Sequence, residues 1–146
     1  MAYFSASGSG TGTASVGTSS ALTIHGSTSG SLYPGVSTTV TFTADNPSSG
    51  HQQIGTIHLA SIVACDTAFS GGACPSGHEV TTCESAETGA SDTTTSNFWM
   101  ADVVSNQDLA SGNGQSVSAT GTLKLNDLST SQDSCKNVNL LLNFTS

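Results

Sequence analysis

The sequence has almost no positive charge. Arginine is absent, and Lys124 and Lys136 stand against ten aspartates and glutamates, so the formal net charge is -8 at pH 7. A protein that binds nucleic acid or an anionic membrane surface needs a basic patch that displaces counterions. Two lysines cannot form such a patch, so the composition excludes nucleic acid as a partner.

Long apolar runs and a secretory leader are also missing. No stretch approaches the roughly 20 apolar residues of a membrane-spanning helix, so we expect no membrane insertion. The residues after Met1 lack the basic start and apolar core of a signal peptide. We expect that a leader has been removed and that Met1 replaces it, with synthesis without a leader as the alternative.

Aromatic residues make up only 5% of the chain, whereas serine and threonine supply about a third and glycine another 16 residues. This bias favours strands with hydroxyl-bearing outer faces and tight turns over long helices. A chain of 146 residues fits one domain.

Period-two alternation of apolar and polar side chains is clearest near the C-terminus. It runs through residues 115–125 and, after a polar turn, through residues 138–144. Such alternation makes one face of a strand apolar. Two such strands joined by a polar loop predict an antiparallel hairpin that buries its apolar face against a second sheet.

Four more segments have strand character, at residues 21–25, 36–44, 53–64 and 93–104. The alternation slips between Leu59 and Ile62, which predicts a β-bulge or burial on both faces. With turn signals at the spacing of a sandwich, the chain as a whole indicates seven or eight strands and no helix. The sequence therefore predicts an all-β, immunoglobulin-like antiparallel sandwich over residues 18–146.

Residues 1–17 form a Gly/Ser/Thr-rich arm ahead of this domain. A flexible linker is one interpretation. However, its few apolar residues keep the period of a strand, which would pair with a sheet edge of its own domain or of a neighbouring subunit. In the second case the arm is a donor strand, and the predicted subunit contacts are Tyr3, Phe4, Ala6, Ala14 and Val16.

The four cysteines, Cys65, Cys74, Cys83 and Cys135, form an even set in a hydroxyl-rich chain, as expected of an oxidising, extracellular compartment. Zinc is disfavoured because no Cys-x-x-Cys pair occurs. We therefore expect disulfides, for which three pairings exist. A Cys65–Cys74 bond would close a short Gly-rich loop, and a Cys83–Cys135 bond would tie the middle of the chain to its last strand.

No combination of residues indicates catalysis, a metal or a cofactor. The four histidines are scattered at His25, His51, His58 and His78, and none pairs with another at metal-ligand spacing. The sequence therefore predicts a protein that is not an enzyme. Five carboxylates lie in the middle of the chain, and we interpret them as groups that keep the surface soluble: Glu79, Glu84, Glu87, Asp92 and Asp102.

A glycan-binding protein usually presents an exposed aromatic side chain. Trp99 and Tyr33 are the two candidates, but Trp99 falls in a strand whose pattern favours burial on both faces, so we expect it in the core. The irregular stretch 65–92 is long for a compact domain, and such loops are often functional.

Short motifs at both ends of the chain carry a resemblance. The start Ala-Tyr-Phe-Ser-Ala-Ser-Gly, the later Leu-Tyr-Pro-Gly, the strand Phe-Trp-Met-Ala-Asp-Val and the ending Gln-Asp-Ser-Cys-Lys-Asn resemble small secreted actinobacterial proteins of uncharacterised function. More weakly, the start is similar to camelysin and TasA-type subunits of bacterial surface fibres. The resemblance implies an exported immunoglobulin-like sandwich with a long-range disulfide to the last strand, and it carries over no catalytic residue. It ranks the pairing Cys65–Cys74 with Cys83–Cys135 first.

Two functions follow as hypotheses. In the first, the protein is an extracellular structural subunit that forms homo-oligomers or fibres, with the arm added as a strand to a neighbour; a virion surface protein is a variant of it. In the second, it is a glycan- or ligand-binding surface module whose site lies in the stretch 65–92.

Overall fold

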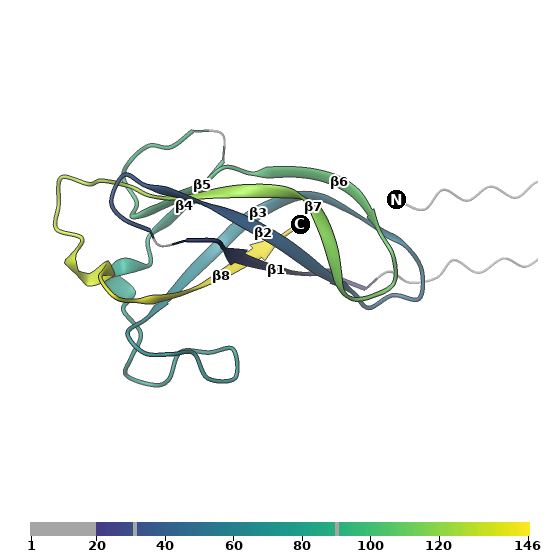
Figure 1. Cartoon of the computed structure of the whole chain (residues 1–146), viewed down its shortest axis with the longest axis horizontal. Helices are drawn as coiled ribbons and strands as arrows, with labels where there is room; N and C mark the ends of the chain where they lie inside the picture. Colours follow the sequence, from purple (N-terminus) through teal and green to yellow (C-terminus); the bar gives the residue numbers. More distant parts are fainter. Residues whose placement is uncertain (1–19, 31, 90) are drawn as a thin grey trace, which may run out of the picture.

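The computed structural model describes residues 20–30, 32–89 and 91–146. Over these residues the chain forms a two-layer, sandwich-like all-β fold of eight strands with two short 3₁₀ turns and no α-helix (Figure 1). The elements follow one another as β1 (Thr23–Thr28), β2 (Ser37–Asn46), β3 (Gln52–Cys65), η1 (Thr81–Cys83), β4 (Ala86–Thr88), β5 (Phe98–Met100), β6 (Val103–Leu109), β7 (Gly112–Leu125), η2 (Asp133–Cys135) and β8 (Asn139–Thr145). No helix in the described part of the chain is long and apolar enough to cross a membrane.

The strands divide into two sheets. One has five strands in the order β1-β2-β7-β5-β4, and the other has three in the order β6-β3-β8. All pairs are antiparallel except β4 with β5, which is parallel. The predicted all-β sandwich of seven or eight strands is therefore confirmed, and its immunoglobulin-like topology stays a prediction. The boundary proposed between residues 17 and 18 lies outside the described residues.

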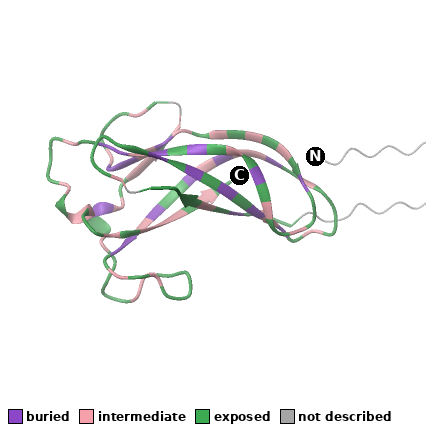
Figure 2. Cartoon of the chain, in the orientation of Figure 1, coloured by how far each residue is buried: buried purple, intermediate pink, exposed green. Residues whose placement is uncertain are grey.

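The alternation predicted over residues 36–44 is confirmed in β2. Val40, Phe42 and Ala44 are buried, and the polar residues between them face solvent, as the alternating colours of Figure 2 show. Facing residues of the other sheet complete the core, which includes Ile54, Ile57, Leu59, Ile62, Phe98, Met100, Leu109 and Leu123. The predicted bulge is also present, as a register shift between Leu59 and Ser61 where β3 pairs with β8.

The C-terminal hairpin prediction is wrong. β7 pairs with β2 and β5 in the larger sheet, whereas β8 pairs with β3 in the other. Alternation says that a strand has one buried face, but it does not say which strand lies beside it. Residues 126–138 cross from one sheet to the other instead of turning back, because buried Asn126 and Cys135 are tied to segments outside both strands.

The structure forms both disulfides in the expected pairing, Cys65–Cys74 and Cys83–Cys135. The first closes a loop that projects from the sandwich at the bottom of Figure 1. The second joins η1 to η2 and therefore links the connection before β4 to the connection before β8.

A side chain connects the two sheets where β7 bulges. The register of β2 against β7 skips from Thr120 to Val117, so Ser118 and Ala119 have no partner in β2. From β6, the Gln107 amide donates to the Ser116 carbonyl oxygen (2.8 Å) and accepts from the Ser118 N–H (2.8 Å). This primary amide satisfies the polar main-chain groups that the bulge leaves unpaired.

Removing the Cys83–Cys135 bond should cost more stability than removing Cys65–Cys74. The sequence separations are 52 and 9 residues, for which the chain-entropy model gives about 4 and about 2.5 kcal/mol. Urea unfolding of the two paired cysteine-to-alanine variants measures the difference. An equal or reversed order would contradict this assignment.

Gly26→Ala should destabilise the fold by about 1–3 kcal/mol. A Cβ at this position in β1 would collide with the Phe144 ring of β8. Gly55→Ala in β3 is the matched control, because a Cβ there meets nothing within 4 Å. In urea unfolding, its free energy of unfolding should be unchanged or higher. Equal losses in both variants would show that the Gly26–Phe144 contact is not tight.

Candidate functional site

A groove of about 1020 Å³ lies between β1 and β8 and is here called the β1–β8 groove. These strands lie side by side in Figure 1 but belong to different sheets. β1 pairs only with β2, and β8 only with β3, so within the described structure each leaves one edge without a strand partner. The sandwich is therefore open along this side.

The groove is closed at one end and open at the other. At the closed end the Phe144 ring reaches the backbone of Gly26 and meets Phe42 edge-to-face, with ring centroids 5.1 Å apart and planes at 88°. Beyond this contact β1 and β8 part, and the groove extends past Thr28 and Leu140 toward the segments around Tyr33 and η2. An extended chain would enter from that open end.

The inner wall of the groove is apolar, and the charged side chains Asp127, Asp133 and Lys136 also line it. Phe98 and Leu125, which belong to the core, line it, and along its sides lie partly buried side chains that pack on the core without being covered: Leu32, Val138, Leu140 and Leu142. The prediction that the apolar face of residues 138–144 points inward is therefore correct. The leucines on this face are only half-buried because β1 does not pair with β8. Tyr33, at 64% exposed, lies at the open end.

The edges of the groove lack the usual protection against strand addition. Natural edge strands are blunted by lysine, proline or a charge pointing inward. β8 contains no charged residue and no proline, and in β1 only His25 can carry a charge. The sequence prediction missed the groove because it paired β8 with β7. The only indication of an open edge was the lack of charge among the mostly apolar residues of β8.

The predicted subunit contacts Tyr3, Phe4, Ala6, Ala14 and Val16 lie outside the described residues.

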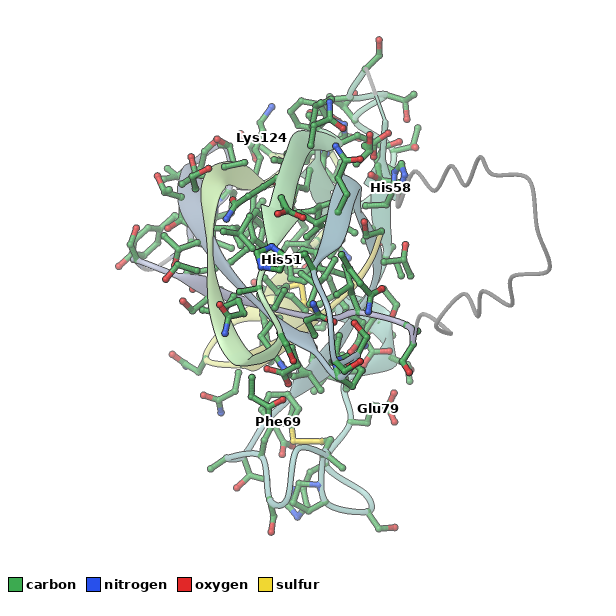
Figure 3. All side chains as sticks on the ribbon, turned by 90° about the vertical axis from the view of Figure 1, so that its right-hand side faces the viewer. His51, His58, Phe69, Glu79 and Lys124 are labelled. Atoms are coloured by element: carbon green, nitrogen blue, oxygen red, sulfur yellow. A yellow bond between two sulfur atoms is a disulfide. The ribbon has the colours of Figure 1, made fainter. Side chains whose placement is uncertain are left out.

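The four histidines do not converge, but each one contacts an aspartate. The nitrogen–oxygen distances are 2.9 Å for His25–Asp45, 2.6 Å for His51–Asp108, 2.8 Å for His58–Asp102 and 2.7 Å for His78–Asp66. Figure 3 shows His51 and His58 well apart. In the described part of the chain no three His, Cys, Asp or Glu residues come together in a group that could hold a metal ion.

Several carboxylates that we interpreted as solubilising instead hold the backbone. Glu84 accepts a hydrogen bond from the Ala64 N–H (2.8 Å), and Glu87 accepts one from the Thr93 N–H (3.2 Å). The stretch 65–92 therefore does not gather its acids into one site. Its first part projects from the sandwich, with Phe69 and Glu79 near the Cys65–Cys74 bond (Figure 3).

Asp92 anchors the long connection before β5 to the end of β7. Its carboxylate accepts hydrogen bonds from the Lys124 ammonium (3.2 Å), the Asn126 amide (2.9 Å) and the Thr94 N–H (2.9 Å). Desolvation acts to raise the pKa of Asp92, but these hydrogen bonds outweigh it and the net shift is downward. No local sequence pattern indicates this cluster, since its members lie up to 34 residues apart.

Acid should destabilise the protein through such aspartates. The pKa of Asp45 is lowered by the Gly114 N–H and His25, and that of Asp92 is lowered as described. An aspartate with a lowered folded-state pKa stabilises the fold above its unfolded-state pKa, and that contribution is lost as pH falls through the folded-state value. The free energy of unfolding should therefore be steady near pH 6 and fall below about pH 4.

Urea unfolding between pH 7 and pH 3 measures this dependence. Asp92→Asn should be less stable than the original chain at pH 7 and should lose less stability on acidification. A variant that loses as much stability as the original chain between pH 5 and pH 3 would contradict the role of Asp92.

Comparison with protein-family models, with curated proteins and with solved structures finds no match to this chain. The resemblance to actinobacterial secreted proteins and to TasA-type subunits therefore stays a prediction. The function has to be argued from the fold and the β1–β8 groove.

Proposed function

We propose that this protein is a non-enzymatic extracellular structural subunit that assembles by placing the 1–17 arm of one copy in the β1–β8 groove of the next. The observation that carries the proposal is the groove itself, which has an apolar inner wall and lies between two edges that have no strand partner in the described structure. Two disulfides in a small β domain support an oxidising location outside the cell.

The arm has the composition that such a groove would accept. It contains no charged side chain, so entry into an apolar channel would not bury a charge. Phe4 and Ala6, and further on Ala14 and Val16, recur at every second position and would face the leucines of β8 while the main chain pairs with an edge. Strand addition supplies main-chain hydrogen bonds whatever the side chains, which suits a Gly/Ser-rich segment.

Docking in a second copy is favoured over docking in the same chain. To lie beside β1 of its own domain, the arm would have to reverse direction just before Thr23. Residues 18–22 read Thr-Ser-Ser-Ala-Leu. They contain none of the residues that favour two-residue hairpin turns most strongly, which are glycine, asparagine and aspartate, and serine favours turns more weakly. An arm that extends away from β1 reaches a neighbour instead, and this head-to-tail contact propagates as a fibre.

Deleting residues 2–17 should convert assemblies into monomers, because the groove loses its occupant. Sedimentation and electron micrographs of the full chain and the deletion variant measure this. A synthetic peptide of residues 2–17 should then bind the deletion variant and raise its melting temperature. Assemblies that persist unchanged without the arm would contradict the proposal, and a full chain that is monomeric and melts higher than the deletion variant would indicate docking within one chain.

A pair of substitutions in β8 tests where the arm docks. Leu140→Lys places a charge in the groove, whereas Leu141→Lys changes the neighbouring residue, which does not line the groove. Circular dichroism establishes that both variants fold. Peptide binding by the deletion variant should be lost with Leu140→Lys and kept with Leu141→Lys, and equal binding by both would place the arm elsewhere.

A further inference from the structure

A second hollow, of about 580 Å³, lies where the chain passes from the larger sheet to the smaller one. β5 ends at Met100 and β6 begins at Val103, so Ala101 and Asp102 form the crossing. Since β5 pairs only with the last three residues of β7, the earlier segment 119–122 of β7 borders the hollow. The side chains that matter here are Trp99, Asp102, Val104, Thr120 and Thr122.

Trp99, expected in the core, lies instead on the opposite face of β5 from buried Phe98 and Met100 and is only partly buried. Its indole Nε1 is shielded from solvent and has no hydrogen-bond partner among the described residues. Because this N–H is shielded, Trp99 borders the hollow with its ring and not with its N–H.

Asp102 is held in place through only one of its two carboxylate oxygens. Its Oδ1 accepts a hydrogen bond from the Thr88 hydroxyl (2.7 Å) and contacts His58 Nδ1 at 2.8 Å. The hydrogen bond from Thr88 has the largest effect and lowers the pKa of Asp102, and the contact with His58 lowers it further. The side chain is therefore a carboxylate at neutral pH. No described residue donates a hydrogen bond to Oδ2, which leaves a fixed acceptor at the hollow.

The remaining wall is apolar or hydroxyl-bearing and has no cation. Val104 is 65% exposed, one of the few large apolar side chains so exposed in the described structure. Lys124 is the cross-strand partner of Trp99, but its ammonium is bound to Asp92. A phosphate, sulfate or carboxylate ligand would therefore meet Asp102 without a compensating positive charge.

We propose that this hollow binds a hexose unit of a neutral oligosaccharide. A pyranose ring has an apolar C–H face, which fits the indole and Val104, and a rim of hydroxyls, which both donate and accept hydrogen bonds. One hydroxyl donates to Asp102 Oδ2, which has no donor among the described residues. The inference is independent of assembly, since the hollow and the β1–β8 groove share no lining residue.

Intrinsic fluorescence tests the proposal on the full chain, because Trp99 is its only tryptophan. Titration with cellohexaose, maltohexaose or chitohexaose should give a saturable change in emission with at least one of them, confirmed by calorimetry. Absence of both signals with all three would overturn the proposal.

Two variants with matched controls place the site. Asp102→Asn should weaken binding about tenfold or more, because the bond from a sugar hydroxyl loses its charged acceptor. Asp108→Asn removes an aspartate that also contacts a histidine but lies outside the hollow, and it should bind normally. Val104→Ser should weaken binding about threefold. Its control is Val36→Ser, which changes another exposed valine and should leave binding unchanged. Binding that neither Asp102→Asn nor Val104→Ser changes would show that the sugar binds elsewhere.

Discussion

The fold depends on the crossing of residues 126–138 between the two sheets, which the Cys83–Cys135 bond holds in place. Cys83 is fully buried, and its partner sits in η2, immediately before β8. This bond holds the connection after β7 close to η1, and from there β8 runs beside β3. Cys135 also lines the β1–β8 groove, so the same covalent link forms part of its wall.

Besides the disulfide, buried asparagine amides hold the connections at both ends of the sandwich. Asn97 donates to the Cys83 carbonyl oxygen (3.3 Å) and accepts from Gln132 (3.0 Å), and so joins η1, the start of β5 and the approach to η2. At the other end of the sandwich Asn46 donates to the carbonyl oxygens of Gly50 (2.9 Å) and Leu109 (3.1 Å). An amide that donates and accepts can satisfy several main-chain groups without burying a charge. Neutral amides therefore hold these two ends of the sandwich.

The strands were largely predictable from sequence, whereas their pairing and the candidate sites were not. The alternation in β2 and the slip in β3 report burial directly, since each residue's face follows from its position along a strand. Partner choice depends on groups far apart in the sequence: β8 pairs with β3, and the connection before it is tied by Cys135 to Cys83. Trp99 lies on the face of β5 opposite buried Phe98 and Met100, a face that the alternation alone does not mark as outer. The roles of Asp92, Asn97 and Gln107 were equally hidden, because a hydrogen bond between residues far apart in sequence leaves no local pattern.

The distribution of charge connects the fold to its surfaces. The exposed face of β2 carries Ser37, Thr39, Thr41 and Thr43, and most acids lie in connections or at strand ends, so the net charge of -8 does little to protect the strand edges. β8 is left as an uncharged strand with half-buried leucines and one edge that no described strand covers. Such an edge recruits another strand unless something occupies it. In the proposed assembly, the uncharged arm that every copy of the chain carries would fill this edge and cover the leucines. The edge would then have a specific occupant in place of indiscriminate aggregation.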